Sequence, residues 1–200
     1  MKKILLSIYD TFSEFEITVA TAMLRDSYQI VTVSESLNII KGESGLQFVP
    51  HLMYQQVDPS EYEGIIIPGG DLIHVKDTYS LFDVTKTMHE QNKLTAAICS
   101  GPYVLARAGV LEGKPYTVTL HHEQRNFLGC FEEELFRYDS VVKSGHVITA
   151  QGHAFVDFAI TLAEQLGVLK NPQFVSEFYR GQRNRLMEQS ERERRHDDRN

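Results

Sequence analysis

The 200-residue sequence is poor in cysteine, with only Cys99 and Cys130, and their positions match no spacing that is typical of a metal site. Two cysteines cannot form the disulfide framework of a small secreted domain, which excludes that class of protein. Because cytosolic proteins keep their thiols reduced, this composition favours a cytoplasmic protein.

The sequence also lacks long apolar runs and an excess of positive charge. No run approaches the roughly 18 apolar residues that a membrane-spanning helix requires. The net charge is −7 at pH 7, so we expect no basic surface that would bind nucleic acid or an anionic membrane. The apolar run near the start is too short for a signal peptide, because acidic side chains follow from Asp10 onward, and it is predicted to be a buried strand.

The most informative stretch that is present spans residues 94–104. A short apolar run leads to Cys99, a Ser-Gly-Pro turn follows, and residues 103–108 have a helical pattern. Hydrolases hold a nucleophilic serine in the same order of strand, turn and helix. Free N–H groups at the start of a helix stabilise an anion, so the pattern predicts a lowered pKa and a nucleophilic thiol. The alternative is that Cys99 is a small, buried and inert apolar residue.

Short apolar runs alternate with amphipathic stretches along the rest of the chain. Strands are predicted at residues 4–9, 28–33, 63–67, before Cys99 and at 116–120, with an antiparallel excursion at 39–49 and a hairpin formed by 135–142 and 146–150. Helices are predicted at 13–25, 80–92, 103–108, 121–128, 154–166 and 172–187. This alternation indicates an α/β fold, with a mainly parallel sheet between two layers of helices.

The chain is predicted to form a single domain over residues 1–187. Residues 172–187 add a helix to its C-terminal end. The charged residues 188–200 have no apolar face and are predicted to be a disordered tail.

Functional sites in such a sheet form at the carboxyl ends of the strands. Three stretches with polar or reactive side chains fall at predicted strand ends, namely residues 10–16, residues 68–71 and Cys99. Their agreement favours a functional site over an inert cysteine.

Several segments have sequences that occur together in one family. They are Ser-Glu-Phe-Glu at 13–16, Ile-Ile-Ile-Pro-Gly-Gly-Asp at 65–71, the cysteine block at 97–111 with Gly113 and Lys114, and Ile-Thr-Ala-Gln-Gly at 148–152 leading into 156–159. Through them the chain resembles the ThiJ/PfpI family, or Parkinson-disease-protein superfamily, of the class I glutamine-amidotransferase-like fold. The resemblance implies a flavodoxin-like, three-layer α/β/α sandwich with a small β-hairpin, and a homodimer.

The resemblance also implies roles for four residues. Cys99 falls on the family's reactive cysteine, and Glu16 falls on the glutamate that hydrogen-bonds it. Burial and a neighbouring thiolate would both keep Glu16 protonated, so that it could donate to sulfur. Gly70 and Ser100 fall on the positions whose backbone N–H groups bind an oxyanion, the charge that develops when a nucleophile attacks a carbonyl.

The residues at 13–16 and the two glycines could also have a purely structural role. Ser13 and Glu16 have the spacing of a helix capping box, which needs only helix geometry. Glu14 is a second candidate for the site, although it is expected to be a solvated acid in the first helical turn. Gly69 and Gly70 could form an ordinary turn after a strand.

No histidine has an obvious place beside the thiol. Peptidase-like members of the family carry a histidine directly after the cysteine, where this chain has Ser100, so that Cys-His dyad is absent. Other members supply a histidine from the strand after the Gly-Lys block, at the position of Thr119 without a gap. His121 lies two residues further and is the candidate, on the same face if the strand continues. The alternatives are His122, His153, or a surface histidine without a role.

These features predict a cysteine-dependent enzyme that uses no cofactor or metal and takes a small-molecule or peptide substrate. It would be a hydrolase of the protease or amidase type, or a glyoxalase or deglycase, in which Cys99 attacks a small electrophilic carbonyl. The alternative is a non-catalytic oxidative-stress sensor or chaperone that is switched by oxidation of Cys99. An interaction module with an inert cysteine is the third hypothesis.

Overall fold

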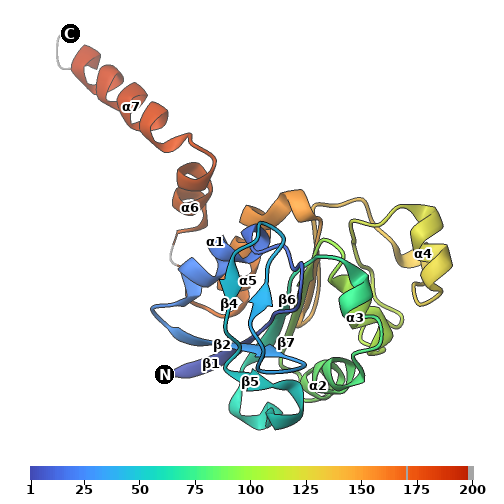
Figure 1. The fold of residues 1–200 in the computed structure, drawn as a ribbon. Coiled ribbons are helices and arrows are strands. Elements are labelled where there is room, and N and C mark those ends of the chain that lie inside the picture. The colour runs from blue at the N-terminus through green and yellow to red at the C-terminus, as the bar shows by residue number, and fades with distance from the viewer. Residues whose placement is uncertain (170, 198–200) are drawn as a thin grey trace.

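The computed structural model of the chain describes residues 1–169 and 171–197. Its body is a seven-stranded sheet with the strand order β5-β2-β1-β6-β7-β9-β8 (Figure 1). Every neighbouring pair in this sheet is parallel except β8 and β9, which form an antiparallel hairpin. The strands are β1 Lys2–Ser7, β2 Tyr28–Ser34, β5 Leu52–Met53, β6 Gly64–Ile67, β7 Leu94–Ile98, β8 Val141–Ser144 and β9 Val147–Ala150, and β3 Ile40–Lys41 and β4 Gln47–Phe48 form a separate pair.

Helices cover both faces of the sheet, which confirms the predicted α/β/α sandwich. α1 and α5 pack against each other on one face, and α2 and α3 pack against each other on the other face (Figure 1). The α-helices are α1 Phe15–Leu24, α2 Tyr79–Glu90, α3 Pro102–Arg107, α4 His122–Leu128, α5 Phe155–Gln165, α6 Pro172–Tyr179 and α7 Arg183–Asp197. The 3₁₀ helices are η1 Tyr54–Gln56, η2 Pro59–Glu61, η3 Leu72–His74, η4 Glu133–Leu135 and η5 Gly152–Ala154.

The central strands form the middle of the core. Every residue of β6 and β7 is buried, as expected for parallel strands that are covered by helices on both faces. β7 lies between β6 and β9, and the loops that follow these three strands carry residues 68–70, Cys99 and residues 151–153. The order of the strands therefore brings three loops that are distant in sequence to one edge of the sheet.

Residues 116–120 form one isolated β-bridge instead of the predicted strand. The N–H group of Thr117 donates to Thr149 Oγ1 at 2.9 Å, and that of Thr119 donates to the carbonyl oxygen of Cys99 at 2.8 Å. Because these groups bond to the ends of the central strands, the segment is tied to the cysteine turn and not to a strand ladder.

Two further differences lie at the edges of the sheet. The first arm of the hairpin, predicted to begin at residue 135, begins at Val141. The edge strand β5 was not predicted, because two residues are too few to show a hydrophobic period.

The C-terminal segment also differs from the prediction. Instead of one helix over 172–187, α6 and α7 are separated by a turn in which Gly181 has a φ of 69°. α7 continues to Asp197, so the described part of the predicted disordered tail is helical, and residues 198–200 lie outside the described residues. Figure 1 shows α7 extending away from the body of the molecule. Nowhere in the described parts of the chain is a helix long and apolar enough to cross a membrane.

Candidate functional site

Cys99 stands at the sharp turn between β7 and α3, as predicted. Its φ is 61°, in the left-handed region that residues other than glycine rarely adopt. Two backbone hydrogen bonds hold it there, because its N–H donates to the carbonyl of Ala150 at 2.9 Å and its own carbonyl accepts from Thr119 at 2.8 Å. Backbone strain of this kind persists only where the surrounding structure compensates for it, and such positions cluster at functional sites.

Glu16 lies in the first turn of α1 and is only 1% exposed. Its Oε2 accepts a hydrogen bond from the N–H of Gly69 at 2.8 Å, and its carboxylate accepts a hydrogen bond from the thiol of Cys99. The capping-box interpretation is wrong, because the hydroxyl of Ser13 donates to Glu43 Oε2 at 2.6 Å instead of capping the helix. The structure therefore brings together the cysteine and the glutamate that the family resemblance indicated.

Glu14, the second candidate, is not the solvated acid that the sequence predicts. It is 6% exposed, and its Oε1 accepts hydrogen bonds from the N–H and the hydroxyl of Ser44, in the turn between β3 and β4. An added Cβ at Gly42 would stand 2.8 Å from Glu14 Oε2. Glu14 is buried because it fastens this turn to the start of α1.

Two glycines enclose the pair formed by Cys99 and Glu16. A Cβ added at Gly69 would stand 2.5 Å from Cys99 Cβ and 2.9 Å from both the sulfur and Glu16 Oε2. A Cβ added at Gly152 would stand 3.0 Å from Glu16 Oε1 and 3.1 Å from the sulfur. The side chains occupy the space that a larger residue would need, so Gly69 is more than an ordinary turn residue.

Burial changes the proton affinity of both reactive groups. It raises the pKa of Glu16 to about 7, against the opposing effect of the hydrogen bonds from Gly69 and Cys99. The predicted effect of burial is confirmed, but the predicted effect of Cys99 is wrong, because its thiol donates to the carboxylate and lowers this pKa. Burial, followed by the effect of the Glu16 carboxylate, raises the pKa of the Cys99 thiol to about 12. The prediction of a lowered thiol pKa is wrong, because the N–H of Ser100 and the hydroxyl of Thr119 favour the thiolate too weakly to offset these two effects.

The two predicted oxyanion donors have different environments. The N–H of Ser100 points at the sulfur of Cys99. The N–H of Gly70 donates to Ser100 Oγ at 3.1 Å, and the same hydroxyl donates to the carbonyl of Gly70 at 2.8 Å. Gly70 has a φ of 145°, and the backbone of residues 11–12 leaves no room there for a Cβ. The oxyanion role of both residues stays a prediction.

His121 does not continue a strand, so the reason for placing it beside the thiol does not hold. It precedes α4, its N–H donates to Gln124 Oε1 at 3.0 Å, and its side chain is exposed. The alternative His122 has its Nδ1 3.0 Å from Glu133 Oε1, and His153 is exposed, with its Nε2 3.4 Å from Ser140 Oγ. Within residues 1–169 and 171–197, no three histidine, cysteine or acidic side chains are grouped as a metal ion would require.

Thr119 occupies the place beside the thiol for which a histidine was sought. Its side chain hydrogen-bonds the sulfur of Cys99, and its Oγ1 accepts the N–H of Gly152 at 2.9 Å. The ungapped comparison with the family pointed to this position, but it gave no reason to assign a function to a threonine.

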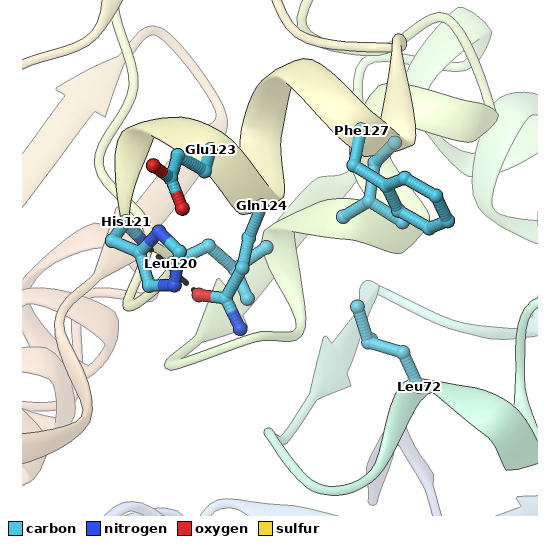
Figure 2. A pocket seen from close by; sticks show the side chains of 7 residues that line it. Leu72, Leu120, His121, Glu123, Gln124 and Phe127 are labelled. Atoms are coloured by element: carbon cyan, nitrogen blue, oxygen red, sulfur yellow. Dashed lines mark hydrogen bonds between the residues drawn. The ribbon is translucent and has the colours of Figure 1, made fainter.

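Two surface hollows lie next to the site and share three lining residues. The larger, of about 430 Å³, is lined in part by Gln151 and by Thr119, whose side chain also contacts the sulfur of Cys99. The smaller, of about 350 Å³, lies between η3 and α4, with Leu72 facing Phe127 across it (Figure 2). The shared residues are Leu120, His121 and Gln124.

The DJ-1/PfpI family profile matches residues 2–165, so the chain belongs to the DJ-1/PfpI family. A deglycase of Thermococcus kodakarensis is 28% identical over 130 residues, which cover 62% of this chain and 77% of the relative. A glutathione-independent glyoxalase of Caenorhabditis elegans is 28% identical over 158 residues, which cover 76% of this chain and 82% of the relative. A solved structure of a DJ-1 superfamily protein from Agrobacterium tumefaciens aligns with a TM-score of 0.78 and 26% identity, over 88% of this chain and 95% of that one.

Proposed function

We propose that the chain is a cysteine-dependent enzyme that converts small reactive aldehydes, as a glyoxalase or deglycase does. The observation that carries the proposal is the buried pair of Cys99 and Glu16, in which the thiol donates a hydrogen bond to the carboxylate. Relatives that are named deglycase or glyoxalase support this choice among reactions of a thiol with a carbonyl.

In the first step, Cys99 adds to the aldehyde carbon. A thiol whose pKa is raised to about 12 is almost fully protonated at neutral pH, so its proton must leave as the sulfur attacks. Glu16, with a pKa of about 7, is close enough to take that proton as a general base. The sulfur–carbon bond forms, the carbonyl π electrons move to oxygen, and Glu16 returns the proton to that oxygen to give a hemithioacetal.

A 2-oxoaldehyde can then be converted without any oxidant. Glu16 can take the hydrogen of the former aldehyde carbon as a proton and pass it to the neighbouring carbonyl oxygen, so that an enediol results. The enediol then loses the proton of its first hydroxyl to Glu16, which leaves the electrons for protonation of the neighbouring carbon. Reprotonation at the neighbouring carbon gives a 2-hydroxyacyl thioester at Cys99. Water releases the 2-hydroxy acid and restores the thiol, so the net reaction adds one water molecule. The N–H groups of Ser100 and Gly70 are the proposed donors to the developing oxygen charge, which they would bind in place of their present acceptors, the Cys99 sulfur and Ser100 Oγ.

His121 is proposed to contact the substrate and not to act beside the thiol. It lines both hollows, so its ring would contact the part of the substrate that lies away from the reacting carbon. Hydrolysis of an amide or peptide is the less supported activity, because Ser100 stands where peptidase-like members have a histidine to protonate the leaving amine.

The experiment is an assay of methylglyoxal and glyoxal consumption by the wild type, Cys99→Ser and Glu16→Gln. We expect Cys99→Ser to abolish turnover and Glu16→Gln to lower kcat by about 10²-fold or more, as for loss of a general base. Cys130→Ser is the matched control, because Cys130 is also a half-buried thiol, with a pKa raised by burial to about 11, but lies outside the site. Wild-type turnover in Cys99→Ser would refute the proposal.

The alternative function is a sensor in which two molecules of peroxide oxidise Cys99 to a sulfinic acid and are reduced to water. The observation that favours it is the adjacent Glu16, which when protonated can donate to a sulfinate oxygen. Mass spectrometry after peroxide treatment separates the two functions, because a sensor would form sulfinate readily while showing no aldehyde turnover.

We also propose that the protein is a cytoplasmic homodimer. The support is its family membership and the exposed aromatic side chains of Phe174, Phe178 and Tyr179 on α6. Light scattering coupled to size-exclusion chromatography would measure the mass in solution, and a monomer at micromolar concentration would contradict the dimer.

A further inference from the structure

The Pro68–Gly69 peptide lies between a buried tyrosine and the glutamate of the reactive pair. The hydroxyl of Tyr9 donates to the carbonyl oxygen of Pro68 at 2.9 Å. The N–H group of the same peptide unit belongs to Gly69, and it donates to Glu16 Oε2 at 2.8 Å. Because the unit is trans and planar, its C=O and N–H groups point in opposite directions. An anchor on the carbonyl therefore limits the directions that the N–H can take.

We infer that the hydroxyl of Tyr9 is a positioning group, which holds the Pro68–Gly69 peptide so that the N–H of Gly69 points at Glu16. The inference rests on the proposed function only in taking Glu16 as the base for Cys99. Tyr9 acts through the peptide and not on the reacting atoms.

The surroundings of Tyr9 keep its ring and its hydroxyl in place. Tyr9 follows β1 and is 5% exposed, and its ring centroid lies 6.4 Å from that of Phe12. A Cβ added at Gly70 would stand 2.9 Å from Tyr9 Cε2, and a Cβ added at Gly101 would stand 2.7 Å from the carbonyl oxygen of Pro68. Because the ring and the carbonyl oxygen are both closely covered, there is little room for a water molecule to take the place of the hydroxyl.

The orientation of the peptide matters because the bond from Gly69 stabilises the ionised form of Glu16. That bond opposes the rise in the pKa of Glu16 that burial causes. A donor on the carbonyl of the peptide also polarises it and strengthens its N–H as a donor, since hydrogen bonds in a chain reinforce one another. Loss of the Tyr9 hydroxyl should therefore weaken the bond from Gly69 and raise the pKa of Glu16 further.

The titratable groups that face Glu16 do not make up for such a loss. The thiol of Cys99 already donates to the carboxylate, and Glu43, from the turn between β3 and β4, raises the pKa of Glu16. Tyr9 also faces Glu16, and burial raises the pKa of Tyr9 well above its ordinary value of 10. The Tyr9 hydroxyl therefore keeps its proton, and remains a donor, throughout the neutral pH range.

The test is the rate of Cys99 alkylation by iodoacetamide as a function of pH, measured in a Cys130→Ser background so that one thiol reports. The reactive form appears when the pair of Cys99 and Glu16 loses its first proton, so the wild-type rate should rise with a midpoint near pH 7. Tyr9→Phe keeps the ring and removes the hydroxyl. It should move that midpoint upward by about half a pH unit or more, which is the effect of one weakened hydrogen bond.

A second measurement follows Glu16 without using the thiol. In protein with isotope-labelled glycine, the amide resonance of Gly69 should shift as Glu16 ionises, because the N–H of Gly69 is bonded to that carboxylate. Its midpoint should rise in Tyr9→Phe as the alkylation midpoint does. The dispersion of the other glycine resonances shows in the same spectrum that the variant is folded.

The matched control is Tyr54→Phe, which also removes a buried tyrosine hydroxyl, here one that lies 2.7 Å from Ser7 Oγ. Tyr54 is close enough to influence the pKa of Tyr9, so this control also detects a general loosening beside β1. It should leave both midpoints in place even if it lowers the melting temperature.

An unmoved midpoint in Tyr9→Phe, or an equal shift in Tyr54→Phe, would overturn the inference. Neither measurement needs turnover, so these outcomes are independent of whether aldehydes are consumed, which the Cys99→Ser assay decides.

Discussion

At the scale of single residues, the site depends on how tightly a carboxyl group is buried. Glu16 sits between Gly69, Gly152 and Cys99 in a space that excludes solvent. Two neutral hydrogen-bond donors reach it and lower its pKa, whereas the carboxylate of Glu43 raises it. Burial therefore dominates, and the protein contains a carboxyl group that holds its proton up to neutral pH.

This burial predicts a dependence of stability on pH. In the folded protein Glu16 has a pKa of about 7, above its ordinary value of 4.5, so the folded state binds the proton more tightly. The stabilisation that comes from this tighter proton binding is fully present below pH 4.5 and is lost as the pH rises through 7. Between pH 4.5 and 7 the free energy of unfolding of the wild type should fall by about 3 kcal/mol relative to that of Glu16→Gln, whose side chain cannot titrate.

Urea unfolding of both proteins at several pH values between 4.5 and 8 would measure this difference. The comparison removes the contribution of the other titrating groups, which the two proteins share. A difference in unfolding free energy that stays constant over this range would show that Glu16 titrates normally in the folded state.

At the scale of elements, a buried arginine links α4 to the segments that precede and follow it. Arg125 is 3% exposed, and its guanidinium makes a bidentate pair with Glu133 of η4, in which Nε donates to Oε2 at 2.9 Å. Its third bond is to the carbonyl of Leu120, and it stacks 3.7 Å above the ring of Phe136. Arg125 lines the larger hollow, so this pair also shapes the surface beside the cysteine turn.

Removal of the acidic partner should be costly. Glu133→Gln would leave the Arg125 charge buried without its counter-ion, and we expect the free energy of unfolding to fall by about 2 kcal/mol. This is less than for a fully buried ion pair, because Glu133 is itself partly exposed. Glu134→Gln, an exposed neighbour, is the matched control and should change stability little. The measurement is urea unfolding at pH 7, and equal stabilities of the two variants would contradict this account of α4.

The same pair predicts how stability changes in acid. Arg125 lowers the pKa of Glu133 to about 2, below its ordinary value of 4.5. The contribution of the ionised Glu133 to the free energy of unfolding is present above pH 4.5 and is lost as the pH falls toward 2. The difference in unfolding free energy between the wild type and Glu133→Gln should therefore shrink over that range.

At the scale of the whole molecule, the C-terminal arm formed by α6 and α7 is distinct from the body. The family match ends at residue 165, and α6 is joined to α5 by an ion pair between Arg180 and Asp157, both of which are partly exposed. Within the arm, Arg183 pairs with Glu177 and lies 4.4 Å from the ring centroid of Phe174. Surface ion pairs of this kind contribute about 1 kcal/mol or less.

Deletion of residues 171–200 should therefore leave the body folded. We expect the melting temperature, followed by circular dichroism, to change by only a few degrees, because the ion pair that joins the arm to α5 is partly exposed. Aldehyde turnover should also persist, since no residue of the site lies in the arm. Arg180→Gln would show how much of any change comes from the ion pair, and a truncated chain that fails to fold would show that the arm completes the core.

The sandwich and the reactive cysteine could be predicted because they depend on local patterns, whereas Glu16 was indicated only through the resemblance to the family. The fully buried runs of β6 and β7 are continuous apolar segments, and the cysteine turn has its own strand, turn and helix signature. The environment of the cysteine could not be predicted in this way. Burial raises its pKa most, and Glu16, which is 83 positions earlier in the chain, raises it further.

By itself the sequence determined the order of the elements, the parallel sheet, the family and the position of the thiol, because hydrophobic periods and turn residues act over a few neighbouring positions. Only the tertiary structure decided that Glu16 serves the thiol and not the helix end, that Glu14 is buried, and that Thr119 rather than His121 contacts the sulfur. The physical reason is that proton affinity and hydrogen-bond choice depend on distance and desolvation, and these are set when strands β1, β6, β7 and β9 bring their loops to one edge.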